Sequence, residues 1–274
     1  MSEYEGNRGK SLEALFLEPP KSALPGPRKR PLVSAPAQKL SPQQAVLLKR
    51  LVRVHPIDSI LMGASGGGAF VESASQQAQG HGFTKAADVH NYLDLMVLFG
   101  HRFNVDPQLP WVAPALSRKS MTALFDSALN YLGVISGETG DLYIKALLRA
   151  RKCAPAFLVD KVCGSAGELS ALLSTLHPEK CKVMRSQIPA LFTLAQALTA
   201  QHSKGVRPLY PVLMFLLGSY FETDPRYAWA GELLRDSGAS ESIRYKRLYE
   251  EALSRLRLAL RARSGLEALV EEVG

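Results

Sequence analysis

The chain has 274 residues, of which 46% are hydrophobic, and a formal net charge of +8 at pH 7. This length allows one large domain or two of ordinary size, and the basic balance makes acidic partners worth weighing. The three cysteines contain no C-x-x-C pair, the N-terminus lacks the pattern of a secretory signal, and no apolar run reaches about 18 residues. We therefore expect a cytoplasmic protein with buried free thiols and no transmembrane segment.

Residues 1–40 differ from the rest of the chain because they are rich in proline and carry a basic RKR run at 28–30. Proline interrupts helix interiors and central strands, so this segment is expected to be an extended or disordered arm. Within it, residues 11–20 (SLEALFLEPP) contain an apolar island, which packs either on the protein's own surface or on a partner. The candidate partner-binding residues of the arm are Leu12, Leu15, Phe16, Leu17, Arg28, Lys29 and Arg30.

The chain contains one stretch twice. Residues 92–111 read YLDLMVLFGHRFNVDPQLPW, and 118 positions later residues 210–229 read YPVLMFLLGSYFETDPRYAW, with no gap. Weaker matches flank this repeat, because LVRVHP before the first copy resembles LSTLHP before the second, and LFDSAL after the first resembles LYEEAL after the second. Two copies favour a duplication over a long solenoid.

These matches divide the chain into five parts. We expect the arm at 1–40, a first helical module at 41–137, a helical bridge at 138–164, a second helical module at 165–264 and a tail at 265–274. Period-two alternation of β-branched residues is scarce, so the fold class is predicted to be all-α, with two related modules in tandem.

Each copy follows the same order of local signals. In the first copy, apolar residues at helical spacing predict a helix from about residue 85, with Thr84 as its N-cap. Gly100 follows, where a left-handed cap favours glycine. Asp106 and Pro107 then predict an N-cap and the first residue of a new helix, which places Trp111 about one turn into it and in the core.

We interpret the two aspartates as caps rather than catalytic acids, and both tryptophans as core residues. A capping box is also predicted at the start of the second module, from Ser165 and Glu168. The residues assigned to the structural motif are Tyr92, Met96, Gly100, Phe103, Asp106, Pro107, Trp111, Tyr210, Met214, Gly218, Phe221, Asp224, Pro225 and Trp229.

The repeated pattern resembles a family of small helical proteins of unassigned function that are encoded in bacterial type VI secretion loci, near spike-tip and effector genes. Residues 92–111 match the family's Tyr-x-Asp-Leu-Met helix and its Gly-x-x-Phe-x-x-Asp-Pro-x-x-Pro-Trp turn, and HPEKC at 177–181 matches its Pro-Glu-Arg-Cys-like block. The first module departs from that block with Ile57, Asp58 and Ser59. The resemblance implies an accessory role around a secreted toxin and supplies no catalytic residues.

One catalytic pattern was weighed against this interpretation. GASGG at 63–67 matches the G-x-S-x-G nucleophile elbow with Ser65, given a strand at 59–62 and partners such as Asp106 and His177. The aligned block of the second module reads RSQIP, without glycine, so a flexible glycine break between helices is preferred. The chain shows no phosphate loop and no His or Cys spacing for zinc, so no metal or cofactor is expected.

The sequence thus predicts a non-enzymatic accessory protein of a type VI secretion locus, acting as chaperone or adaptor for a secreted effector or spike component. The alternatives are an immunity protein that neutralises a cognate toxin and a serine hydrolase that uses Ser65. A basic helix at 243–263 could bind nucleic acid or an anionic membrane, but we expect a protein partner rather than nucleic acid. The oligomeric state stays open.

Overall fold

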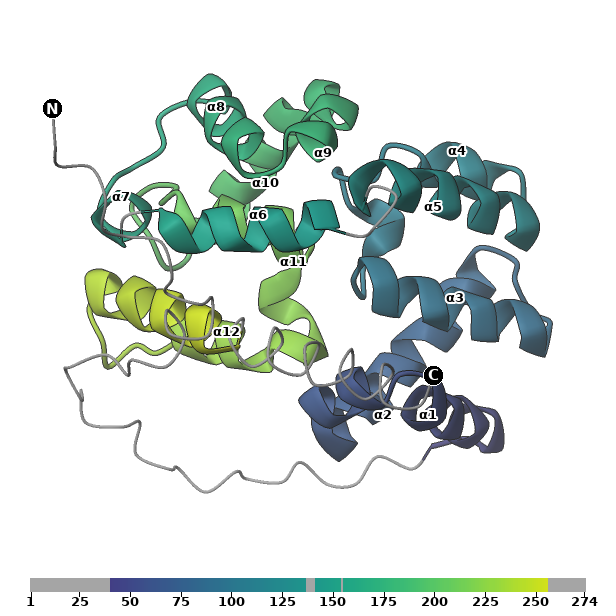
Figure 1. Cartoon of the computed structure of the whole chain (residues 1–274). Coiled ribbons are helices and arrows are strands. Elements are labelled where there is room, and N and C mark those ends of the chain that lie inside the picture. The colour runs from purple at the N-terminus through teal and green to yellow at the C-terminus, as the bar shows by residue number, and fades with distance from the viewer. Residues whose placement is uncertain (1–39, 137–140, 154, 256–274) are drawn as a thin grey trace, which may run out of the picture. The chain divides into compact units, whose positions relative to one another are not determined.

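The computed structural model describes residues 40–136, 141–153 and 155–255, and within these ranges every regular element is a helix (Figure 1). The all-α prediction is confirmed. No helix in the described ranges is long and apolar enough to cross a membrane. The arm, with all of its candidate partner-binding residues, lies outside the described residues, as does the C-terminal tail. The boundaries of the two modules stay a prediction.

The first part of the chain opens with a capping box that the sequence analysis overlooked. The Ser41 hydroxyl accepts from the backbone N–H of Gln44, and the Gln44 side chain accepts from the N–H of Ser41. The elements that follow are α1 (Pro42–Val54), α2 (Pro56–Gly80), α3 (Ala86–Phe99), η1 (Phe103–Val105), α4 (Val112–Ser117) and α5 (Met121–Ser136).

The second part contains the predicted bridge helix and the remaining elements. The Ser165 hydroxyl accepts from the N–H of Glu168, but the Glu168 carboxylate accepts from Gly164 rather than from Ser165, so only half of the predicted capping box forms. Residues 241–255 are also helical. The other elements are α6 (Asp141–Lys152), α7 (Pro155–Val159), α8 (Ala166–Leu176), α9 (Pro178–Val183), η2 (Arg185–Gln187), α10 (Ile188–Thr199), α11 (Leu209–Leu217), η3 (Phe221–Thr223), η4 (Pro225–Tyr227) and α12 (Ala228–Leu234).

The buried apolar side chains gather into two clusters. One cluster draws on residues 47–131 and the other on residues 158–249. Repeat-related rings meet in both, because Tyr92 packs on Phe103 with ring centroids 4.9 Å apart, and Tyr210 packs on Phe221 at 5.0 Å. All three cysteines are free thiols, of which Cys163 and Cys181 are buried and Cys153 is half-buried.

One predicted cap and one predicted helix start are wrong. α3 starts within one residue of the predicted position, but its N-cap is Lys85, without a side-chain hydrogen bond, and the predicted cap Thr84 is exposed. No α-helix begins at Pro107 either, since the chain turns after Asp106 and α4 starts only at Val112. In the second copy a 3-10 helix starts at Pro225, directly after Asp224, and α12 follows it.

The two tryptophans pack against the two clusters, as predicted for core residues, but they are half-buried rather than buried. Each stands at the start of a short helix, at the edge of its cluster. The Trp111 ring packs edge-on against Phe99, with centroids 5.3 Å apart, and Trp229 packs on the second cluster. They contribute packing at a margin of the core.

Candidate functional site

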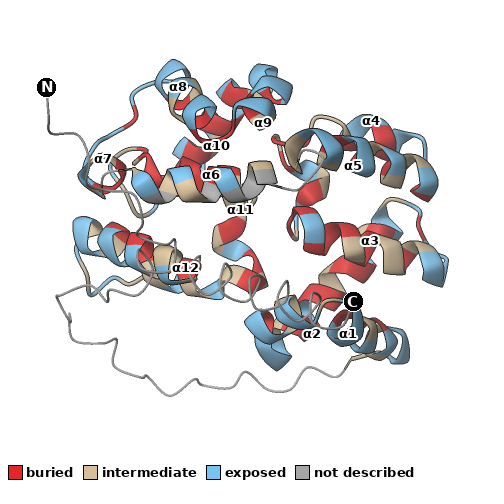
Figure 2. Cartoon of the chain, in the orientation of Figure 1, coloured by how far each residue is buried: buried red, intermediate tan, exposed pale blue. Residues whose placement is uncertain are grey.

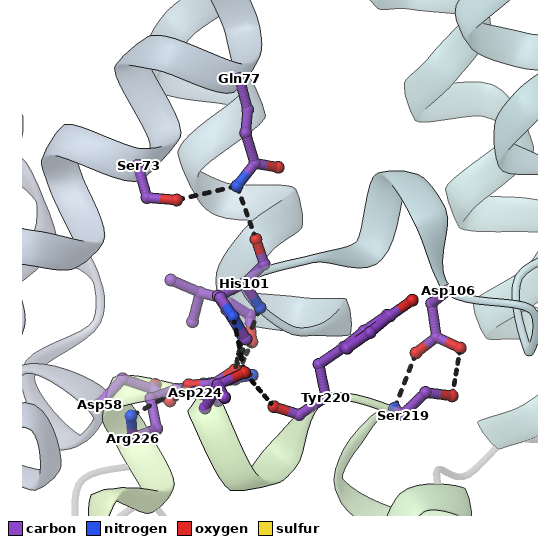
Figure 3. Close-up of polar contacts among 11 residues, drawn as sticks. Asp58, Ser73, Gln77, His101, Asp106, Ser219, Tyr220, Asp224 and Arg226 are labelled. Carbon is purple, nitrogen blue, oxygen red and sulfur yellow. Dashed lines mark hydrogen bonds and ion pairs between the residues drawn. The ribbon is translucent and has the colours of Figure 1, made fainter. Parts of the chain in front are cut away.

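The two copies of the repeated turn contact each other through their aspartates (Figure 3). Asp106 Oδ2 accepts from the backbone N–H of Ser219 at 2.9 Å, and Asp224 Oδ2 accepts from the backbone N–H of His101 at 3.0 Å. His101 and Ser219 occupy the same position in the two copies, directly after the glycine that ends each helix. We call this exchange of hydrogen bonds the reciprocal clasp.

Each carboxylate of the clasp also makes a local bond of the kind expected from a capping residue. Asp106 Oδ1 accepts from the N–H of Gln108 at 2.8 Å, and Asp224 Oδ1 accepts from the N–H of Arg226 at 3.0 Å. The Ser219 hydroxyl adds a third donor to Asp106, at 2.6 Å. These aspartates therefore act as predicted caps within their own copy and also accept a hydrogen bond from the other copy. The sequence carried no signal for this second role.

The glycines before the clasp have a backbone that other residues rarely adopt. Gly100 has φ 109° and ψ 153°, and Gly218 has φ 104° and ψ 147°. This is an extended conformation with positive φ rather than the left-handed helical one that was predicted, and it is essentially restricted to glycine. A Cβ on Gly218 would also stand 3.3 Å from the carbonyl oxygen of Phe99. Glycine is thus required both by conformation and by the approach of the other copy.

The clasp is not symmetric in charge. Arg226 is 5% exposed and binds Asp224 through two nitrogens, with Nε 3.0 Å from Oδ1 and Nη2 2.8 Å from Oδ2. Its Nη1 donates to the carbonyl of Val97 and lies 3.9 Å from the Asp58 carboxylate. The repeat-related residue in the first copy is Gln108, so the second turn holds a buried cation where the first holds a neutral amide.

The pKa values of the two aspartates move in opposite directions. Burial raises the pKa of Asp106, and hydrogen bonds from Ser219 and Gln108 offset this only in part. Burial acts in the same sense on Asp224, but hydrogen bonds from His101 and Arg226, together with the Arg226 charge, hold its pKa well below its usual range. Both carboxylates are buried and bound by the protein's own donors, so the clasp is arranged to hold the turns together.

Ser65 does not lie on a nucleophile elbow. It is an exposed residue of the segment of α2 after Gly63, and residues 59–62, proposed as the preceding strand, are helical and lie before the break at Gly63. The proposed partners have other bonds, since Asp106 belongs to the clasp and His177 Nε2 lies 2.6 Å from the carbonyl oxygen of Ile135. The strand–turn–helix setting in which the pattern works is therefore not formed here.

The predicted glycine break between helices is found at Gly63. Only Gly63 leaves the helical conformation, with φ 65° and ψ −179°, and α2 resumes directly after it. A Cβ on Gly67 would stand 3.2 Å from a methyl group of Leu48 in α1. The break between helices is thus confined to Gly63, while Gly67 lies in the next helical segment, in close contact with Leu48.

An exposed apolar surface lies where α1 meets α2. Ile57, Ile60 and Leu61 are 54%, 79% and 46% exposed, and their i, i+3, i+4 spacing puts them on one face of the helix before Gly63. The exposed residues of α1 and α2 are pale blue in Figure 2. Sequence reasoning missed this face because residues 59–62 were weighed only as a strand. We call it the apolar stripe, defined as Ile57, Ile60 and Leu61.

A hollow of about 530 Å³ lies beside the end of α2. Its lining includes Gln79, His81, Asn104 and Lys119. The His81 ring and the Asn104 amide contact each other, with His81 Nε2 3.2 Å from Asn104 Nδ2. In the ranges that the structure describes, no group of three or more His, Cys, Asp or Glu residues is placed to hold a metal ion. The hollow presents a single cation and no paired acid and base.

No protein-family model, curated protein or solved structure matches the chain. The clasp and the apolar stripe are therefore the two features from which a function has to be argued.

Proposed function

We propose that the protein is a non-enzymatic interaction protein that binds a protein partner through the apolar stripe. The carrying observation is the exposure of Ile60, at 79%, and of its neighbours on one face of a formed helix. Contiguous exposed apolar surface on a folded protein is characteristic of sites that bind other macromolecules. Fully burying one such side chain contributes about 1.5–3 kcal/mol before the costs of association, so a few residues suffice for a specific contact.

The setting of this binding is proposed from the resemblance of the repeat. It points to a type VI secretion locus, in which the protein would act as chaperone or adaptor for an effector or spike component and hold it in the cytoplasm. The immunity role differs only in outcome, because the same surface would occlude a toxin's active site. The unformed setting around Ser65 supports a binding role over a hydrolytic one.

The test is a binding measurement with each protein encoded beside this chain in the genome. The double variant Ile57→Glu with Ile60→Lys should keep its melting temperature and bind its partner about 10–1,000-fold more weakly, since each 1.4 kcal/mol is a factor of ten. Leu129→Lys is the matched control, because Leu129 is 62% exposed on α5 and outside the stripe. Equal binding by both variants would contradict the proposal.

Two further measurements separate the roles. A chaperone is required for its partner to accumulate, whereas an immunity protein abolishes the partner's toxicity. Ser65→Ala should change neither binding nor any activity of the protein. If that variant lost a measurable hydrolytic activity, the enzyme interpretation would replace ours.

A further inference from the structure

The two copies can be compared position by position around the apolar stripe. His55 and His177 each end one helix and precede the next, and their N–H groups donate to the carbonyls of Leu51 and Leu173 at 2.9 and 3.0 Å. This common geometry fixes the match between the α1–α2 and α8–α9 junctions. The matched pairs that are buried in both are Leu47 with Leu169, Leu51 with Leu173, and Met62 with Met184.

The exposed positions do not match in the same way. Four exposed apolar residues of the first junction stand where the second has polar or charged side chains, while Leu61 is matched by another exposed apolar residue, Val183. The helical junction therefore tolerates charge at these positions, and the fold does not explain why they are apolar. The four pairs are Val46 with Glu168, Val52 with Ser174, Ile57 with Glu179, and Ile60 with Lys182.

The spacing of the stripe indicates the shape of what it binds. Ile57, Ile60 and Leu61 form one ridge on the segment of α2 before Gly63. Such a ridge packs most closely against a second helix that presents apolar residues at the same spacing.

The exposed charged residues of α1 are basic, whereas the carboxylates near the junction lie close to cationic partners. Lys49 and Arg53 are exposed on α1. Between residues 41 and 71 the single carboxylate is Asp58, and it lies 3.9 Å from the buried Arg226. Asp94 of α3 is bound to Arg50 and His55. The charges that α1 exposes beside the stripe are therefore Lys49 and Arg53, and a partner with carboxylates beside its apolar face would be favoured in both encounter and register.

We propose that the apolar stripe binds an amphipathic helix of another protein whose apolar face is flanked by Asp or Glu. This rests on the proposed function and adds the chemistry of the partner. Lys49 and Arg53 pair with the flanking carboxylates, and the isoleucines pack between the partner's apolar residues. A second copy of this chain is disfavoured, because it would bring Lys49 and Arg53 of one copy against those of the other.

The test uses a displayed library of peptides of about 18 residues, long enough to form a helix on binding. The library is selected on the full-length protein and depleted on the Ile57→Glu, Ile60→Lys double variant. Enriched peptides should combine apolar residues at i, i+3 and i+4 with a net negative charge. Their affinity should fall at least about tenfold on the double variant and on Lys49→Glu with Arg53→Glu, should stay unchanged on Leu129→Lys, and should weaken with added salt.

Several outcomes would overturn the proposal. Enrichment of neutral or basic peptides, or of none, would refute the partner chemistry. A wild-type dimer that the double variant dissociates in sedimentation would make the stripe a self-interface, and stripe-dependent binding to phosphatidylglycerol vesicles without enrichment of acidic peptides would make it a membrane surface. The two proposals can fail separately. If acidic peptides bind but no protein encoded beside this chain does, only the proposed function is refuted. If such a neighbouring protein binds through the stripe but no acidic peptides are enriched, only the proposed partner chemistry is refuted.

Discussion

Asp106 and Asp224 lie 118 residues apart, and each accepts the backbone N–H that the other copy presents directly after its glycine. The exchange uses main-chain donors that are fixed by the conformations of Gly100 and Gly218. The repeated turn is therefore explained by what each copy does for the other as well as by its local geometry.

Replacing Arg226 with Gln should reduce the free energy of unfolding by about 3–5 kcal/mol, because it leaves the Asp224 carboxylate buried without its cation. The measurement is urea denaturation. Arg235→Gln is the control, since Arg235 is 60% exposed and 3.8 Å from Glu222, and its loss should cost below about 1 kcal/mol. Similar losses in the two variants would show that the buried pair is no stronger than a surface one.

The two aspartates should give opposite pH dependences. The folded-state pKa of Asp224 lies below that of the unfolded chain, so its contribution to stability is present above about pH 4 and is lost as the pH falls below that value. The pKa of Asp106 is raised, so its contribution is present below about pH 4 and is lost as the pH rises through the folded-state pKa.

Carbon-13 titration of the two carboxyl groups measures this directly, and Asp224 should titrate at the lower pH. In denaturation series across acidic pH, Asp224→Asn should flatten the loss of stability on acidification, whereas Asp106→Asn should flatten the loss on raising the pH. The opposite order of titration would contradict our account of the Arg226 charge.

Gly218→Ala should destabilise the protein more than Gly63→Ala. Both glycines have positive φ with extended ψ, so each alanine meets a backbone cost of about 1–3 kcal/mol. A Cβ on Gly63 has no neighbour within 4 Å, whereas one on Gly218 stands 3.3 Å from Phe99 O. The difference between the two variants in urea denaturation measures the close approach of the copies, and a difference of zero would show that the turns move apart freely.

Either tryptophan replaced by alanine should reduce the free energy of unfolding by less than about 3 kcal/mol, which is the lower limit for fully buried tryptophans. The reason is that Trp111 and Trp229 are both half-buried at the edge of a cluster. Thermal or urea denaturation of the two single variants tests this. A loss of about 5 kcal/mol at either site would show that the residue is a core anchor after all.

Deleting residues 1–38 should leave the melting temperature unchanged and weaken partner binding about 10–1,000-fold, because the apolar island of the arm is expected to contribute a few kcal/mol to that contact. A melting curve and a titration of the shortened chain are the measurements. A large drop in melting temperature would instead assign Leu15 and Phe16 to the protein's own core. Unchanged binding with an unchanged melting curve would make the arm a passive tail.

The fold class and the order of elements within each copy could be predicted, because apolar residues at helical spacing and glycine stops are local signals. The bonds from Asp106 to Ser219 and from Asp224 to His101 could not, since nothing near an aspartate reveals a donor more than 100 residues away. From the sequence alone, both aspartates are explained equally well as helix caps. Only the repeat itself indicated that the two turns were related.

The apolar stripe was missed for a different reason. Residues 56–62 show helical spacing, but Gly63 and the glycines after it favoured a break or an elbow in that region. The close contact between Gly67 and Leu48 of α1 is a tertiary constraint that a sequence pattern does not contain. The half-burial of both tryptophans likewise depends on where the short helices begin.

Opening of the reciprocal clasp can be followed through the amide hydrogens that form it. The amide hydrogens of His101 and Ser219 each point at an aspartate carboxylate, and Ser219 is fully buried. An amide hydrogen held in this way exchanges with solvent deuterium only when the structure around it opens. Two resonances, one from each copy, would therefore report whether the halves of the clasp open together or one at a time.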